Sequence, residues 1–345
     1  MAPVTLPLPA PTPGAEQPPS RTVPRSVSDW VLQILTGYSS ALMLVVLLVV
    51  FASMTFSDFA TAENFRNIFA QAAPGAMVAL AETLTMVVGE FDLSVGYVSS
   101  LAGVMFIGFM VNQHMGFLEA LLLTLVVAAG FGLLNGVIVV KLGVNAFIGT
   151  LGVGIAAVGV NYLYGGGATM AGTLPNVVTQ LGIGSAGLSY VAWVWLGVAV
   201  ALWLYSEQTR PGIHSRAIGG NQNASRLAGL RVSRLKLAAF IMAAVLAASG
   251  GILLATQLGS GEPTAGDGYL LDAFAAAFLG TGFYRAGEFS VPGTVLGALV
   301  LEVGFNGLAI LGYPTAARYL FEGGILVLAL GIGAVARRWR MGRSS

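Results

Sequence analysis

The chain has 345 residues, of which 56% are hydrophobic and only 9% are charged, and its mean hydropathy is +0.82. A soluble domain carries about 25% charged residues, so this composition excludes a soluble globular protein and predicts an all-α protein that crosses a membrane many times. The chain has no cysteine, two isolated histidines and no basic patch with interleaved aromatic residues. These features exclude disulfides, metal clusters and a nucleic-acid-binding surface.

The N-terminal segment, residues 1–27, holds eight of the fourteen prolines and lacks the apolar run of a signal peptide. We expect a disordered cytosolic tail there. Windows of about 20 apolar residues then predict ten spans within a transmembrane domain over residues 28–336, followed by a basic cytosolic tail, 337–345. The spans are 38–56, 68–89, 94–112, 117–140, 145–164, 189–206, 237–257, 269–283, 291–311 and 317–336.

The positive charges orient these spans. When the spans alternate from a cytosolic N-terminus, fourteen of the sixteen Lys and Arg residues fall on the cytoplasmic side. Only Arg66 and Arg318 fall outside. Because cytoplasmic loops carry an excess of Lys and Arg, we predict that both termini face the cytoplasm.

Some segments are irregular. The stretch 271–283 is too short to cross a membrane without tilting, and glycine-rich breaks occur at 165–167 and 259–268. Interrupted helices of this kind are typical of a transporter's path, although many of the 47 glycines serve close helix packing.

The segment 207–236 is polar and carries six Lys and Arg residues against one acid, Glu207. Asn221 or Asn223 can cap a short helix inside it, and Gly229 lies near the end of that helix. The apolar residues of so short a helix have no core of their own to enter. These apolar residues predict that the helix docks in a groove of a partner protein. The alternative is that the segment is an ordinary cytosolic loop whose charges orient the protein in the membrane.

The remaining candidates are intramembrane or boundary acids, which are costly in hydrocarbon. Asp92 and Glu90 lie at a span boundary, where the alternative is a simple turn with Asp92 or Ser94 capping the next helix. Glu302 and Asn306 share one helical face and predict interhelical hydrogen bonds. The chain has no phosphate-binding G-x-x-x-x-G-K-(S/T) motif and no nucleophile and base constellation, so we expect no catalytic residues and no cofactor in this chain.

Four stretches carry a resemblance. Residues 89–96, GEFDLSVG, resemble the G-G-(I/F)-D-L-S-V-G signature of the ribose-type permeases of ATP-binding-cassette (ABC) importers, with Glu90 in place of the second glycine. Residues 217–236 resemble the cytoplasmic coupling segment of these permeases. Residues 145–152 resemble P-x-F-I-x-T-L-G with Asn-Ala in place of proline. Residues 257–280 resemble a further signature, with Leu271 in place of the acid before Asp272, and the similarity covers roughly residues 80–335.

The resemblance implies the membrane subunit of an importer in the bacterial inner membrane, which moves a sugar or similar small polar solute into the cytoplasm by alternating access. It implies a separate ABC ATPase that binds the ATP, an extracytoplasmic solute-binding protein and a second permease copy as partners, all within a lipid bilayer. It assigns contact with the ATPase to Gly219, Gly220, Asn221, Ala224, Arg226, Leu227 and Gly229. It places along the translocation path Asp92, Ser94, Gly96, Asn145, Phe147, Thr150, Glu302 and Asn306, and we expect Glu90 to be peripheral.

A different class stays open. An ion-coupled secondary transporter needs no ATPase and would use intramembrane carboxylates such as Glu82, Asp92, Glu302 and Glu322 as its proton or sodium groups.

Overall fold

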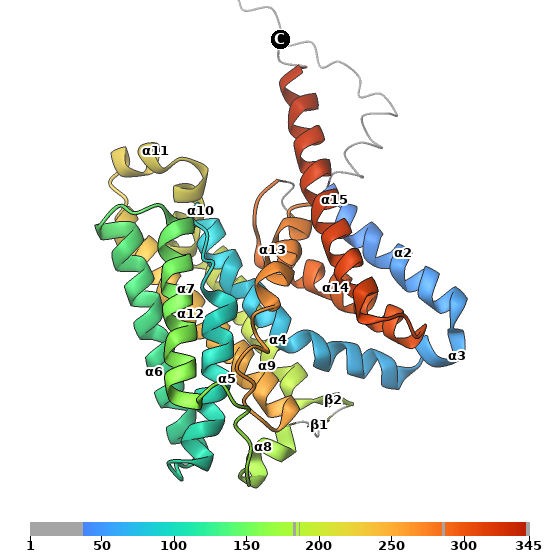
Figure 1. Ribbon diagram of the computed structural model, residues 1–345. Coiled ribbons are helices and arrows are strands. Elements are labelled where there is room, and N and C mark those ends of the chain that lie inside the picture. The colour runs from blue at the N-terminus through green and yellow to red at the C-terminus, as the bar shows by residue number, and fades with distance from the viewer. Residues whose placement is uncertain (1–36, 182–183, 186, 285–286, 343–345) are drawn as a thin grey trace, which may run out of the picture.

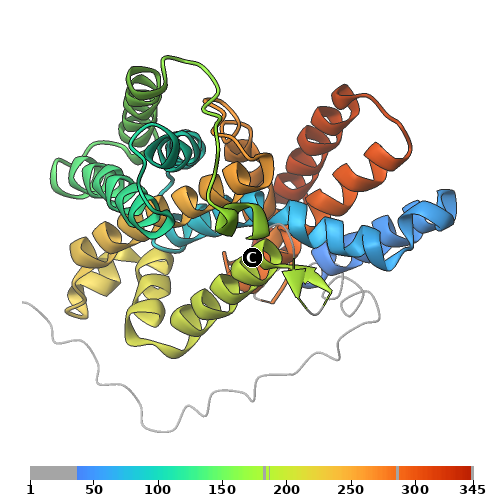
Figure 2. The same ribbon diagram turned by 90° about the horizontal axis from the view of Figure 1, so that it is seen from below.

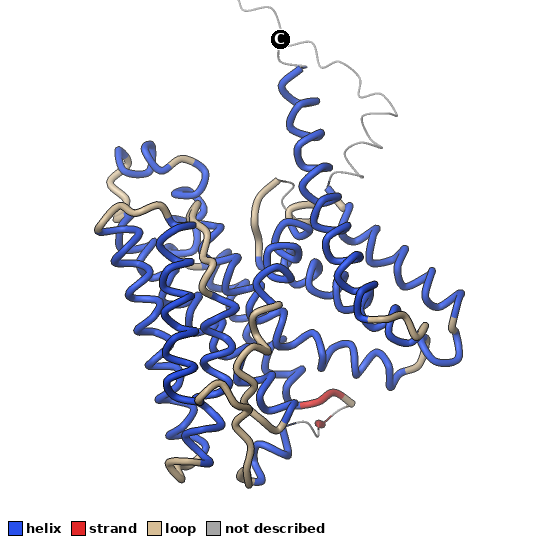
Figure 3. Tube along the Cα trace, in the orientation of Figure 1, coloured by secondary structure: helices blue, strands red, loops and turns tan. Residues whose placement is uncertain are grey.

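The computed structural model describes residues 37–181, 184–185, 187–284 and 287–342, and within them the chain is helical almost throughout (Figures 1 and 3). The predicted N-terminal tail lies outside the described residues. The elements, in chain order, are α2 Ser39–Met54, α3 Phe56–Phe59, α4 Ala62–Val87, α5 Val95–Val111, α6 Phe117–Gly136, a π-helical turn η1 Val137–Lys141, α7 Ala146–Gly165, α8 Asn176–Leu181, β1 Gly184–Ser185, β2 Leu188–Ser189, α9 Tyr190–Gln208, α10 Arg210–Gly220, α11 Gln222–Leu227, α12 Val232–Leu258, α13 Tyr269–Gly280, α14 Val291–Ile310 and α15 Thr315–Gly342.

Within the described residues, ten helices lie at the ten predicted spans: α2, α4, α5, α6, α7, α9, α12, α13, α14 and α15. Five of them, α6 with η1, α7, α9, α12 and α14, are long and apolar enough to cross a membrane. Helices α2, α5 and α13 are apolar but shorter, whereas α4 and α15 are longer and carry charged residues. The protein is therefore an all-α polytopic membrane protein, as the composition predicts.

Helix α12 lies at the centre, where it packs against α4, α5 and α6. Figure 2 shows α5, α6 and α7 gathered on one side of α12 and α4, with α2, α14 and α15 on the other. Helix α5 is buried along nearly its whole length. Outer helices expose large apolar side chains instead, among them Leu163 on α7 and Leu320 on α15, as lipid-facing surfaces require.

The two ends of the bundle differ (Figure 1). Helices α10 and α11 project from one end, and α15 rises on that same side, whereas α8 and the β1–β2 hairpin lie at the opposite end. This arrangement places the basic segment 207–236 and the basic end of the chain on one side, in agreement with the distribution of positive charge in the sequence. We refer to the α10–α11 end as the inner end and to the opposite end as the outer end.

The predicted glycine break at 259–268 is confirmed as non-helical backbone that protein atoms satisfy. Gly259 ends α12 in the left-handed conformation (φ +66°). Further along, Asn161 Nδ2 donates to the Pro263 carbonyl at 2.8 Å, and the Gly266 N–H donates to Ser100 Oγ at 3.0 Å. Because bilayer hydrocarbon offers no hydrogen bonds, irregular backbone at membrane depth needs such partners.

The shortness of α13 is also confirmed. Its 12 residues rise about 18 Å at 1.5 Å per residue, well below the roughly 30 Å of a hydrocarbon core. The helix ends at Gly280, whose backbone lies directly against Gly293 of α14. The connection from α13 to α14 lies at the end of the bundle, where Ser290 is beside Glu207, and α13 is too short to cross the membrane by itself.

Close contact between α5 and α12 gives a stability prediction. A Cβ added at Gly251 would come within 1.9 Å of the Ser99 carbonyl oxygen, whereas a Cβ at Gly130, on exposed α6, would meet nothing within 4 Å. We therefore expect Gly251→Ala to lower the free energy of unfolding by about 1–3 kcal/mol through overpacking. Gly130→Ala, the matched control, should be neutral or stabilising. Thermal unfolding in detergent measures both, and equal melting temperatures for the two variants would contradict the packing argument.

Candidate functional site

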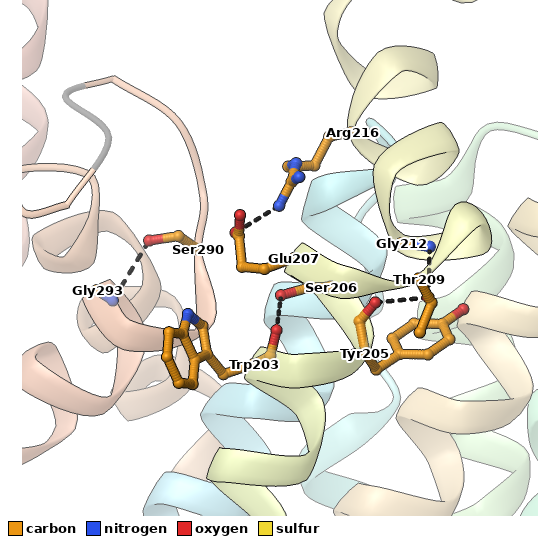
Figure 4. Close-up of polar contacts among 9 residues, drawn as sticks. All are labelled: Trp203, Tyr205, Ser206, Glu207, Thr209, Gly212, Arg216, Ser290 and Gly293. Atoms are coloured by element: carbon orange, nitrogen blue, oxygen red, sulfur yellow. Dashed lines mark hydrogen bonds and ion pairs between the residues drawn. The ribbon is translucent and has the colours of Figure 1, made fainter.

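Helix α10 is joined to α9 by a tight elbow at Thr209 (Figure 4). The Gly212 N–H donates to Thr209 Oγ1 at 3.3 Å, and the Thr209 hydroxyl donates to the Tyr205 carbonyl at 2.6 Å. Across the elbow Arg216 forms an ion pair with Glu207. These contacts fix the direction in which α10 leaves the bundle.

Helix α11 has the predicted cap and an unpartnered apolar residue. Asn221, not Asn223, is the N-cap: its Oδ1 accepts from the Ala224 N–H at 2.9 Å. The helix ends before Gly229, whose φ of +80° favours glycine. Leu227 is 91% exposed. The structure therefore has two short helices here, α10 and α11, where the sequence predicted one. Helix α10 was not predicted.

The inner turn, residues 88–94 between α4 and α5, lies directly beneath this segment. A Cβ at Gly219 of α10 would come within 2.1 Å of the Val87 carbonyl oxygen, so only glycine permits this approach. The buried Lys236 Nζ donates to Glu90 at 2.5 Å and to Gln222 Oε1 at 2.9 Å. Lys236 thereby joins the turn to α11.

Glu90 has a partner that the sequence did not predict, because it forms an ion pair with Lys236. Its peripheral place relative to the translocation path stays a prediction. Glu90 stands where the resembled signature has glycine, and the buried Lys236 ammonium neutralises its charge. Removing one partner of a buried pair leaves the other uncompensated.

The opposite face of the turn carries a buried hydrogen-bond network around Asp92, which is 0% exposed. Ser94 donates to Asp92 Oδ1 through its backbone N–H at 2.9 Å and its hydroxyl at 2.6 Å. Asn135 Nδ2 of α6 lies 3.2 Å from both Asp92 oxygens and 2.7 Å from Ser94 Oγ. The Asp92 N–H in turn faces the Glu82 carboxylate of α4, at 3.2 and 3.3 Å.

Thr150 extends the network to α7. Its hydroxyl oxygen accepts from the Leu93 N–H at 2.9 Å and donates to the Ala146 carbonyl at 2.7 Å. The network therefore joins four helices, and its side chains are fully enclosed. The sequence analysis missed Asn135, and a lone amide within an otherwise apolar span was the signal that could have found it.

Other expected path residues lie apart from this network. Asn145 caps α7, its Oδ1 accepting from the Phe147 N–H at 3.0 Å, and Phe147 is exposed. Gly96 lies against the backbone of Gly266. A conduit role for these residues, and for Asp92, Ser94 and Thr150, stays a prediction.

Glu302 and Asn306, which share a face of α14, have different surroundings. Asn306 makes two reciprocal 2.9 Å hydrogen bonds with Asn64 of α4, which confirms an interhelical role. Glu302 instead faces a cavity of about 210 Å³ between α4, α12, α13, α14 and α15, here called the outer cavity. Because Gln257, near the outer end of α12, also lines it, the cavity lies toward the outer end of the bundle. Its polar side chains are Gln71, Gln257, Tyr269, Asp272, Glu302 and Arg318.

Residues 64–330 match a protein-family model described as "Branched-chain amino acid transport system / permease component". The ribose import permease protein of Escherichia coli is 34% identical over 298 residues, which cover 84% of this chain and 91% of the relative. The D-allose transport system permease protein of Escherichia coli is 28% identical, covering 86% and 90%. The galactose/methyl galactoside import permease protein of Salmonella typhimurium is 32% identical, covering 84% and 93%. No solved structure matches the chain.

The ion pair at the inner turn gives an asymmetric prediction. Glu90→Gln should lower the free energy of unfolding by about 1–3 kcal/mol, because it leaves the buried Lys236 cation without its counter-charge. Lys236→Met should cost less, because the Glu90 side chain is 20% exposed and reaches water. The double variant should recover most of the loss. Thermal unfolding compares the variants with Glu63→Gln, an exposed control, and additive effects in the double variant would refute the coupling.

The Asp92 network gives a second prediction. Asp92→Asn keeps one acceptor for Ser94 or Asn135, whereas Asp92→Leu leaves several buried donors unpaired, at about 1–3 kcal/mol each. We therefore expect the leucine variant to melt well below the asparagine variant and to transport less. Expression in membranes, thermal unfolding and uptake measure the difference. Full stability and activity of Asp92→Leu would show that the turn is only a connector.

Proposed function

From the premise that this chain belongs to the family of branched-chain amino acid transport system permease components, we propose that it conducts a sugar or similar small polar solute into the cytoplasm and is driven by a separate ATPase. The observation that carries the proposal is the coupling segment. Helices α10 and α11 stand outside the apolar bundle, are tied to it at both ends, and present Leu227 almost fully exposed. An exposed apolar side chain on a short, fixed helix is suited to a partner's groove.

The proposed class of solute rests on the names of the similar proteins. The family description names branched-chain amino acids, whereas the relatives reported above are named for ribose, allose and galactose. Those sugar permeases align with more than four-fifths of this chain. We take a neutral sugar as the proposed solute.

The partners follow from what the chain itself lacks. Its sequence contains no phosphate-binding motif, so the ATP-hydrolysing motor is a second polypeptide, docked on α10 and α11. A solute-binding protein delivers at the outer end, and a second permease copy completes the pathway. Alternating access requires a bundle with two arrangements that the state of the ATPase biases.

The proposed location is the bacterial inner membrane, with α10, α11 and the end of α15 on the cytoplasmic side. The positive charge of the segment 207–236 supports this orientation. An ion-coupled mechanism has less support, because Glu82 and Asp92 are engaged in hydrogen bonds and two of the similar proteins named above are import permeases.

The docking role of α11 is tested by Leu227→Asp. Burying a leucine contributes about 1.5–3 kcal/mol, so a charge there should weaken association with the ATPase by about 10-fold or more. Co-purification and ATP-driven uptake in proteoliposomes measure the loss. Leu118→Asp, at an exposed leucine near the outer end, is the matched control and should bind the ATPase normally.

Two outcomes would count against the proposed function. Unchanged co-purification and uptake in Leu227→Asp would remove α11 from the docking surface. Uptake driven by a proton gradient in liposomes that hold this chain alone would replace the importer with an ion-coupled transporter.

A further inference from the structure

The outer cavity holds polar groups whose hydrogen-bonding capacity the protein leaves unused. Asp272 accepts from Arg318 Nη2 at 3.2 Å through Oδ2, and its carboxyl also meets the Glu322 carboxyl of α15. No N–H group or hydroxyl of the described residues donates to its buried Oδ1. Glu302 also accepts no hydrogen bond from the part of the chain that the structure describes. A buried acceptor without a donor is unfavourable, so both carboxylates favour a ligand that brings O–H groups.

Neutral groups converge on the same space. Gln257 Nε2 donates to the Ala70 carbonyl at 2.6 Å, which holds the amide in place and leaves its oxygen available. The Tyr269 ring packs against Gly75, where an added Cβ would lie 3.3 Å from the ring. The Tyr269 hydroxyl has no hydrogen-bond partner among the described residues. The cavity therefore offers acceptors and donors side by side, as the hydroxyls of a polyol require.

Arg318 packs against the side of the outer cavity. Its guanidinium carbon lies 4.0 Å from the centroid of the Phe305 ring, a cation–π contact, and Asp272 pairs with its Nη2. The guanidinium is thus partly neutralised before any solute arrives. Aliphatic lining side chains such as Leu254 and Ala76 leave an apolar surface suited to the C–H face of a sugar ring.

The charge balance disfavours anionic solutes. Asp272, Glu302 and Arg318 line the cavity, and Glu322 adjoins Asp272, so three carboxyl groups stand against one guanidinium. An anionic solute meets net repulsion. The carboxylate of an amino acid must displace Asp272 from Arg318, and the desolvation of both groups opposes that exchange.

We propose that the outer cavity is a binding site for a small neutral polyhydroxylated solute, so that the permease itself recognises hydroxyl groups within the membrane. This inference rests on the proposed function and deepens it. The cavity volume of about 210 Å³ far exceeds the roughly 10–15 Å³ that one water molecule needs. Binding is weak, because a station on a path must also release its solute.

Saturation-transfer difference NMR on the full chain in lipid nanodiscs tests the site directly. The probes are D-ribose, D-allose and D-galactose, with L-leucine and D-ribose 5-phosphate for comparison. We expect at least one sugar to give ring-proton signals about 10-fold stronger than those of leucine and of the phosphate. Absence of any sugar signal, or a leucine signal as strong, would overturn the inference.

Variants locate the binding. Glu302→Gln and Asp272→Asn should each weaken the sugar signal about fivefold, the effect of one lost charge-assisted hydrogen bond. Glu63→Gln, an exposed acid outside the cavity, should leave it unchanged. Because Asp272 is buried, gel filtration checks its fold, and Glu302→Gln decides the matter if Asp272→Asn misfolds. A sugar signal that is unaffected in Glu302→Gln places the binding elsewhere.

The two proposals fail separately. ATP-driven sugar uptake by the reconstituted complex, combined with no sugar signal from the permease alone, would reject the cavity site and leave the importer function standing. Sugar binding to the permease without ATP-driven uptake would reject the importer function and leave the cavity site standing.

Discussion

A carboxylate buried between helices is the constraint on which the inner half of this protein depends. Asp92 is completely enclosed, and an unpaired charge in such surroundings costs several kcal/mol. Its hydrogen bonds come from Ser94 beside it and from Asn135 on α6, while its own N–H faces Glu82 on α4. None of these helices can shift alone without breaking a bond that bilayer hydrocarbon cannot replace.

The same turn is held from its other face by the coupling segment. Gly219 packs on the end of α4, and Lys236 joins Glu90 to Gln222 on α11. Tightly packed interfaces switch between discrete arrangements rather than deform continuously. A displacement of α10 and α11 by a docked ATPase would therefore reach the Asp92 network through only a few residues. Glu90 and its counter-charge belong to this connection.

The two polar regions of the bundle differ in how their hydrogen bonds are used. Around Asp92 the carboxylates, hydroxyls and amide N–H groups have partners, and Asn135 Oδ1 is the one buried side-chain atom of this network without a partner among the described residues. Such a network holds helices together. In the outer cavity, by contrast, no N–H group or hydroxyl of the described residues donates to Asp272 Oδ1 or to Glu302, and the Tyr269 hydroxyl has no partner among them, although Glu322 meets the Asp272 carboxyl. Satisfied groups stabilise the fold, and unused groups are available to a ligand. This difference is why the proposed solute site lies in the outer half and why Asp92 fits a structural role better.

The sequence by itself determined the class of protein and most of its outline. Hydropathy placed ten helices where the structure has them, the basic segment 207–236 was found as the part outside the bundle, and a cap was expected at Asn221 or Asn223. These features depend on composition and on neighbours along the chain, which a sequence displays. Only the tertiary structure decided that Lys236 pairs with Glu90, that Asn135 binds Asp92, and that Glu302 and Asn306 face different partners. Each of those contacts joins residues more than 40 positions apart or depends on the rotation of one helix against another, and packing in three dimensions determines both.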